Sequence, residues 1–187
     1  MAQPGQKTAV IRFMAPVDNE TIGALLANVD KLIADGVQKI QLLISTPGGS
    51  VPHGLSAYNY LKGLPIELIT VNFGSADSIG VILFCAGKVR LSVPNARFLL
   101  HGVHSQLAGG ASLSEKQLDE IVKGLQIDTR NIAGVIAATT GKTEEEVYQA
   151  MLAGTTMNPD QAIKFGLVHR VETQLVPPGA SIISIQK

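Results

Sequence analysis

The chain has 187 residues, of which 45% are hydrophobic, and this is enough to bury the core of a single domain spanning 1–187. Fifteen basic and fifteen acidic residues give a net charge of zero, so the chain lacks the basic excess that is typical of proteins that bind nucleic acid or membrane surfaces. The one cysteine excludes an internal disulfide. The sequence does not open with a charged segment followed by an apolar stretch, and no apolar run reaches membrane-spanning length. We therefore expect a cytoplasmic protein.

Apolar runs alternate with segments of helical periodicity along the chain, which indicates an α/β fold with right-handed crossovers. The expected strands, rich in Ile, Leu and Val, are Thr8 to Met14, Lys39 to Ser45, Ile66 to Asn72, Arg97 to His101 and Leu167 to Val171. The first expected helix is capped by Asp18 or Asn19 and ended by Gly36. Five further helices are expected, over Gly54 to Leu64, Ser78 to Ala86, Ser114 to Thr139, Glu144 to Leu152 and Asn158 to Phe165.

The two ends of the chain are less regular. The short polar segment Met1 to Lys7 is expected to be flexible. After Pro177-Pro178 the tail ASIISIQK alternates in polarity, which is compatible with either an edge strand or a disordered end over 177–187. The sequence favours neither.

Ser78 and His101 offer a nucleophile and a base. A serine hydroxyl is a weak nucleophile until a neighbouring imidazole can take its proton, and an unperturbed imidazole titrates at about 6.5. Ser78 follows a predicted strand and begins a predicted helix, where free N–H groups and the helix dipole favour developing negative charge. This pair is typical of a serine hydrolase.

Gly48-Gly49 lies between a predicted strand and a predicted helix, so its unobstructed N–H groups could approach a substrate carbonyl. The Ile79 N–H, directly after Ser78, is the candidate second donor. A Gly-Gly pair also occurs in ordinary tight turns and in phosphate-binding loops. No G-x-x-x-x-G-K-[ST] pattern follows it, which disfavours a phosphate site.

Each residue also has a structural interpretation. A serine at such a junction is usually a helix N-cap, and a single histidine after a strand is usually packed or hydrogen-bonded. The G-x-S-x-G elbow is absent because Ala76 holds its first glycine position, and Asp77 is expected to be a first-turn helix charge. No metal or cofactor is expected, because only two of the four histidines, His101 and His104, lie close together.

The order and spacing of these segments resemble the ClpP family of self-compartmentalising serine peptidases. The resemblance runs from about Thr8 to Val171 and rests on STPGGSV, VNFGSADSIG with VILFCAG, PNARFLLHG, the Gly-Gly-Ala before the long helix, TTGKTEEEV and NPDQAIKFGLV. It implies a ClpP/crotonase-like fold of repeated β-β-α units, in which 114–139 is a protruding handle helix. It also implies that Ser78 is the nucleophile, His101 the base, and the N–H groups of Gly49 and Ile79 the oxyanion hole.

One position departs from the family pattern. The family usually completes its triad with an aspartate shortly before the segment that is here Met157 to Ala162, and the alignment places Gly154 at that position. Thr155 and Thr156 stand beside it, so a threonine hydroxyl or a nearby backbone carbonyl is the expected substitute. A serine protease that loses this carboxylate is slowed but keeps measurable activity. We therefore expect a slower enzyme, or one that assembly activates.

The resemblance implies partners as well. It implies peptide or unfolded protein substrates and homo-oligomeric rings, as a heptamer or a tetradecamer, with the handle between two rings. An AAA+ unfoldase partner stays open, because Met1 to Lys7 is shorter than the N-terminal segment with which family members dock to such ATPases. No cofactor is implied.

Two functions remain open at this point. The first is a ClpP-type serine endopeptidase that works inside an oligomeric chamber. The second is a catalytically weak or inactive structural subunit of such a ring. An acyl-CoA enzyme of the crotonase type would need acid–base carboxylates near the second amide, and the sequence shows no such pattern.

Overall fold

The computed structural model describes residues 7–105 and 112–187. The predicted flexible segment, apart from Lys7, and the Gly109-Gly110 pair before the long helix lie outside these residues. No helix in the described ranges is long and apolar enough to cross a membrane.

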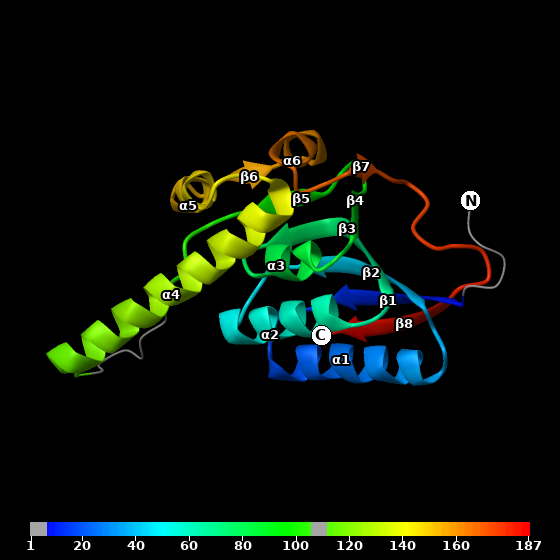
Figure 1. Cartoon of the computed structure of the whole chain (residues 1–187), viewed down its shortest axis with the longest axis horizontal. Helices are drawn as coiled ribbons and strands as arrows, with labels where there is room; N and C mark the ends of the chain where they lie inside the picture. The colour runs from blue at the N-terminus through cyan, green and yellow to red at the C-terminus, as the bar shows by residue number, and fades with distance from the viewer. Residues whose placement is uncertain (1–6, 106–111) are drawn as a thin grey trace.

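A mostly parallel sheet of eight strands forms the centre of the molecule (Figure 1). Its main path runs in the order β6-β5-β3-β2-β1-β8, while β4 pairs with β3 and β7. Every pairing is parallel except that of β5 with β6. The strands are β1 (Thr8–Met14), β2 (Lys39–Thr46), β3 (Glu67–Asp77), β4 (Val89–Ser92), β5 (Arg97–Leu99), β6 (Thr156–Met157), β7 (Arg170–Val171) and β8 (Ser181–Gln186).

The helices follow the strands in the order expected of an α/β fold. They are α1 (Asn19–Ala34), α2 (Val51–Gly63), α3 (Gly80–Cys85), α4 (Glu115–Thr140), α5 (Glu144–Leu152) and α6 (Pro159–Phe165). Four of them, α1, α4, α5 and α6, begin with a capping box, in which an Asp, Ser, Thr or Asn side chain accepts a backbone N–H of the first turn. Figure 1 shows α1 and α2 side by side along the sheet and α4 projecting away from it.

The strand that leads to Ser78 is longer than predicted. The sequence predicts an end at Asn72, but β3 continues to Asp77. Gly74 and Ser75 have the composition of a turn, yet Gly74 is needed inside the strand because a Cβ there would lie 2.6 Å from the Ser45 hydroxyl oxygen. The extra length gives β3 two neighbours: its first half pairs with β4 and its second half with β5. This brings the ends of β3 and β5 together.

The helix after Ser78 is shorter than predicted, and three short strands differ from expectation. The predicted Ser78 to Ala86 helix is α3, which begins at Gly80. β4 and β6 were not predicted, because runs of four and two residues carry too little periodicity to recognise. The predicted strand Leu167 to Val171 contracts to β7.

The structure decides the question of the C-terminal tail. β8 pairs in parallel with β1 from Ala9↔Ser181 to Met14↔Gln186. Ile185 is buried and Ile182 is half exposed, in keeping with the alternation of the sequence. The tail is therefore an edge strand.

An aromatic contact in the core joins the two elements that carry the predicted site. Phe84 of α3 and Phe98 of β5 are fully buried, with ring centroids 5.1 Å apart in an edge-to-face arrangement. Such pairs are favoured because the positive edge of one ring meets the negative face of the other. The contact fixes α3, which follows Ser78, against β5, which precedes His101.

Candidate active site

Ser78 occupies a strained turn between β3 and α3. Its φ angle is 58°, and it is the one non-glycine residue of the described ranges with a positive φ. This conformation disfavours residues with a Cβ and is held by the surroundings, including a 2.8 Å hydrogen bond from the Ser78 N–H to the Leu99 carbonyl. Ser78 is not a helix N-cap, because α3 begins two residues later and has no side-chain cap.

The Gly48-Gly49 loop lies directly against Ser78. Both glycines have positive φ angles, 90° and 146°, and a Cβ on Gly48 would come within 2.7 Å of the Ser78 Cβ. The loop is held from the other side by Val17, whose N–H donates to the Gly48 carbonyl and whose carbonyl accepts from the Ser50 N–H, both at 2.8 Å. Only glycine permits this close approach.

Two backbone donors beside Ser78 remain available to a ligand. Gly49 and Ile79 both line a small cavity together with Ser78. Within the described part of the chain, neither the Gly49 N–H nor the Ile79 N–H donates a hydrogen bond. Two N–H groups near a nucleophile are the arrangement that stabilises an oxyanion.

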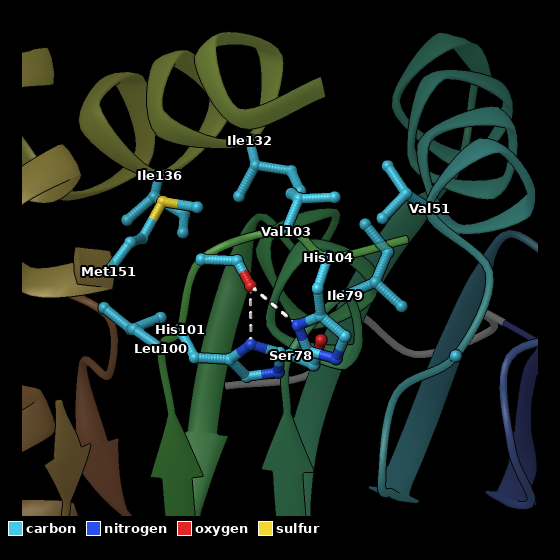
Figure 2. A pocket seen from close by; sticks show the side chains of 12 residues that line it. Val51, Ser78, Ile79, Leu100, His101, Val103, His104, Ile132, Ile136 and Met151 are labelled. Carbon is cyan, nitrogen blue, oxygen red and sulfur yellow. Dashed lines mark hydrogen bonds between the residues drawn. The ribbon is translucent and has the colours of Figure 1, made fainter. Parts of the chain in front are cut away.

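His101 lines the same cavity as Ser78 and comes two residues after β5 (Figure 2). Its Nδ1 lies 2.7 Å from the carbonyl oxygen of Gly102. A carbonyl only accepts hydrogen bonds, so Nδ1 carries the proton and Nε2 keeps its lone pair. No hydrogen bond joins Ser78 to His101 here, and such contacts commonly tighten only when substrate binds.

Neither of the two threonines considered as third members bonds to His101. The Thr155 hydroxyl donates to the Ala150 carbonyl at 2.7 Å, and the Thr155 carbonyl accepts from the Leu100 N–H at 2.9 Å. Thr156 pairs with Leu99 across β5 and β6 and is exposed. These threonines support the strand before His101, whereas the backbone carbonyl that meets its imidazole belongs to Gly102.

The prediction that Asp77 is a first-turn helix charge is wrong. Asp77 ends β3 and is buried, and its Oδ2 lies 2.7 Å from Nη2 of Arg97. Its Oδ1 is buried and has no hydrogen-bond partner among residues 7–105 and 112–187. The longer β3 explains the difference, because Asp77 and Arg97 sit on paired strands. This ion pair links the residue before Ser78 to the strand that leads to His101.

Sequence analysis missed one further feature of the site and one contact beside it. His104 lines the cavity, and its ring stacks on that of His101 with centroids 5.1 Å apart. Ser50, at the start of α2, bonds through its hydroxyl to Nδ1 of His53 at 2.7 Å. The three-residue spacings in HGVH and SVPH are the signals in the sequence for these two contacts. The described residues hold no group of three side chains that could bind a metal.

The cavity is apolar apart from its reactive groups. Its remaining side chains come from α2, the end of β5 and its following segment, α4 and α5, and they are Val51, Leu100, Val103, Ile132, Ile136 and Met151. A groove of about 660 Å³ between α4 and α5 adjoins it and shares Gly102 and Val103 with it. The thiol of Cys85 is fully buried on α3, and burial raises its pKa to about 11, so it is not a competing nucleophile.

Comparisons with known proteins agree with this geometry. A family model described as Clp protease matches residues 5–174. The ATP-dependent Clp protease proteolytic subunit of Bdellovibrio bacteriovorus is 32% identical over 183 residues, which cover 92% of this chain and 83% of that protein. A match to most of the chain in both comparisons shows the family. The chain therefore belongs to the Clp protease family, whose members are peptidases.

Proposed function

We propose that this protein is a serine-type endopeptidase in which Ser78 is the nucleophile and His101 the base. The observation that carries the proposal is that a serine in a strained turn, an imidazole with a bare Nε2 and two undonated N–H groups line one cavity. Strain of this kind is characteristic of functional sites.

The chemistry follows from these groups. The Ser78 Oγ attacks the carbonyl carbon of the peptide bond while Nε2 of His101 takes the hydroxyl proton. The negative charge that develops on the carbonyl oxygen is held by the N–H groups of Gly49 and Ile79. His101 then gives its proton to the leaving amine, and water hydrolyses the acyl-enzyme by the same steps in reverse.

In this scheme the Gly102 carbonyl takes the place of the usual triad aspartate. It holds His101 in the tautomer with a proton on Nδ1, as a carboxylate would. It supplies only the partial charge of a dipole to the imidazolium. We therefore expect a slower enzyme than one with a full triad.

The shape and chemistry of the site suggest the substrate. The apolar cavity beside Ser78 favours an apolar side chain next to the scissile bond, and the adjoining groove suits an extended peptide. An extended chain is available in peptides and unfolded proteins but not in folded domains. These are the proposed substrates.

We propose that the chain assembles into homo-oligomeric rings through α4. The buried residues of α4 all lie in its last third, and they are Ile132, Ala133, Ile136 and Ala137. Leu118 and Ile127 of the projecting part are 47% and 59% exposed and do not line the substrate groove, and a second copy would bury them. The relative named above is the proteolytic subunit of an ATP-dependent protease, which supports an ATPase partner such as an AAA+ unfoldase. We also propose a cytoplasmic location for this protein.

A second candidate is an inactive structural subunit of such a ring. One observation favours it: His101 has no carboxylate partner within the described residues. The intact Ser78 turn argues against it, since a subunit without activity gains nothing from a strained serine.

Hydrolysis of fluorogenic peptides separates the two candidates. The wild type should cleave peptides with Leu or Met before the scissile bond faster than peptides with Asp, and Ser78→Ala should abolish cleavage. Ser75→Ala is the matched control, because Ser75 lies on the same strand but does not line the cavity. Assembled wild-type protein without any cleavage would favour the structural subunit.

A further inference from the structure

A second imidazole stands beside the proposed base. Figure 2 shows the rings of His101 and His104 next to each other near Ser78, with both Nδ1 atoms directed at one carbonyl oxygen. His104 belongs to the segment after β5 and is exposed to the cavity. The proposed proton transfer between Ser78 and His101 does not involve His104.

The two rings share one hydrogen-bond acceptor. Nδ1 of His101 lies 2.7 Å from the Gly102 carbonyl oxygen, and Nδ1 of His104 lies 3.3 Å from the same atom. A carbonyl oxygen has two lone pairs and can accept both bonds. Each ring then carries its proton on Nδ1 and leaves Nε2 bare.

The rings are also stacked, with centroids 5.1 Å apart and planes 26° from parallel. One hydrogen bond fixes the distance of His101 from Gly102 but leaves the ring free to turn about the bond. A flat neighbour at this distance restricts that turning, because rotation would break the ring contact. An aspartate in a full triad fixes the imidazole by hydrogen bonds alone.

We propose that His104 is a positioning residue for His101, an inference that rests on the proposed peptidase function. Its ring holds the plane of the His101 imidazole, and the shared Gly102 carbonyl holds the tautomer, so that Nε2 faces Ser78. The two devices together replace the orienting function of the missing carboxylate.

Three substitutions separate the contributions of the ring and of its N–H. His104→Phe keeps a flat ring but lacks the donor, His104→Asn keeps a donor at a similar place but lacks the ring, and His104→Ala lacks both. Ser105→Ala is the control, because Ser105 is exposed in the same segment and does not line the cavity. The readouts are kcat and KM for a peptide and the rate of Ser78 labelling by a fluorophosphonate.

The expected result is a loss of kcat with KM nearly unchanged. His104→Ala should lower kcat and the labelling rate about 10-fold relative to the wild type. His104→Phe keeps the stacked ring, so its kcat and labelling rate should be only about 3-fold below those of the wild type, because aromatic stacking is strong enough to account for the difference. Equal labelling of the wild type and His104→Ala would overturn the proposal. So would a rise in KM at constant kcat, which would make His104 a substrate contact.

A spectroscopic measurement decides the proposal independently of activity. Imidazole ¹⁵N–¹H spectra of histidine-labelled protein should show His101 as one Nδ1–H tautomer in the wild type and as an averaged mixture in His104→Ala. An unchanged His101 signal would overturn the inference. A wild type that neither cleaves peptides nor reacts with the fluorophosphonate would overturn the proposed function instead. The spectra would still show whether His104 positions the His101 ring.

Discussion

The Ser78 turn depends on a charged residue that does not itself react. Asp77 is 5% exposed and pairs with Arg97, whose side chain is 61% exposed. The second carboxylate oxygen of Asp77 is buried and has no partner in the described part of the chain, so Arg97 is the group that offsets the cost of burying this charge there. The pair connects the neighbour of the proposed nucleophile, Ser78, with the strand that leads to the proposed base, His101.

Removing Arg97 should therefore destabilise the protein more than its exposed position suggests. Arg97→Gln leaves a buried carboxylate without a partner and should cost about 2 kcal/mol of unfolding free energy in urea titrations at pH 7. The double variant with Asp77→Asn should regain part of this loss, because it removes the orphaned charge. Arg170→Gln, which breaks a longer and more exposed ion pair with Glu172, should cost no more than about 0.5 kcal/mol. Equal losses for Arg97→Gln and Arg170→Gln would contradict this account.

Some residues of the site could be predicted from the sequence, and others could not. Ser78, His101 and the glycines stand at the ends of strong apolar runs, so their meeting at one edge of the sheet follows from the alternation of strands and helices. Asp77 could not be placed, because its burial depends on β3 running five residues past the predicted end. The stacking of His104 is a short-range loop geometry without any periodicity to signal it.

At the scale of elements, the site is a meeting of three segment ends. β3 delivers Ser78, β5 leads to His101, and the loop after β2 delivers Gly48 and Gly49. The bulge in the β2–β3 pairing, between Ile44 and Thr46, comes directly before that loop. The Phe84–Phe98 contact fixes α3 against β5. The long strands and helices were predictable from apolar periodicity, while β4 and β6 form through pairing with neighbours.

A side chain at the second glycine should damage both stability and activity. A Cβ on Gly49 would overlap the Val17 carbonyl oxygen, and a φ of 146° is unfavourable for alanine. Gly49→Ala should cost about 1–3 kcal/mol of stability from the backbone alone and lower kcat by about 10²–10³ through displacement of an oxyanion donor.

Gly23→Ala is the matched control for this prediction. Gly23 lies in α1 with no atom within 4 Å of an added Cβ, so alanine there should raise stability by about 0.5–1 kcal/mol and leave kcat unchanged. Thermal unfolding and peptide hydrolysis on the same samples measure both effects. A Gly49→Ala protein with wild-type kcat would remove Gly49 from the oxyanion site.

At the scale of the whole molecule, packing within the described chain buries side chains only near the end of α4. This helix projects from the sheet in Figure 1, and its first two turns carry no buried residue. Leu118→Glu and Ile127→Glu should each lower the mass of the assembly in native mass spectrometry, because each places a charge in the proposed contact between copies. Lys123→Glu, between them on the helix, should have a smaller effect. Unchanged assembly in both apolar variants would exclude this part of α4 from the interface.

The stability of the fold should also fall in mild acid through His169. The Nδ1 of this residue, which lies just before β7, accepts from the backbone N–H of Arg90 in β4 at 3.1 Å, and its Nε2 lies 3.0 Å from the Arg90 guanidinium. Partial desolvation together with the Arg90 and Arg170 charges lowers the pKa of His169 below the usual 6.5. Between the lowered value and 6.5 the unfolded chain binds a proton that the folded chain does not. Stability is therefore full above about pH 6.5 and declines as the pH falls below it.

Urea unfolding midpoints at several pH values between 7.5 and 5.5 check this prediction. The wild type should lose stability over this range, and His169→Gln should give a flatter profile because glutamine does not titrate. Parallel profiles for the two proteins would show that the Arg90–His169 contact does not contribute to the pH dependence.

The most direct test of the central claim is intact-mass analysis after treatment with a fluorophosphonate, with Ser78→Ala and His101→Ala in parallel. The account predicts one adduct per wild-type chain, located on Ser78, none in Ser78→Ala, and labelling of His101→Ala slowed by about 10² or more because the base is lost. An adduct that persists in Ser78→Ala, or assembled wild-type protein that takes up none, would contradict it.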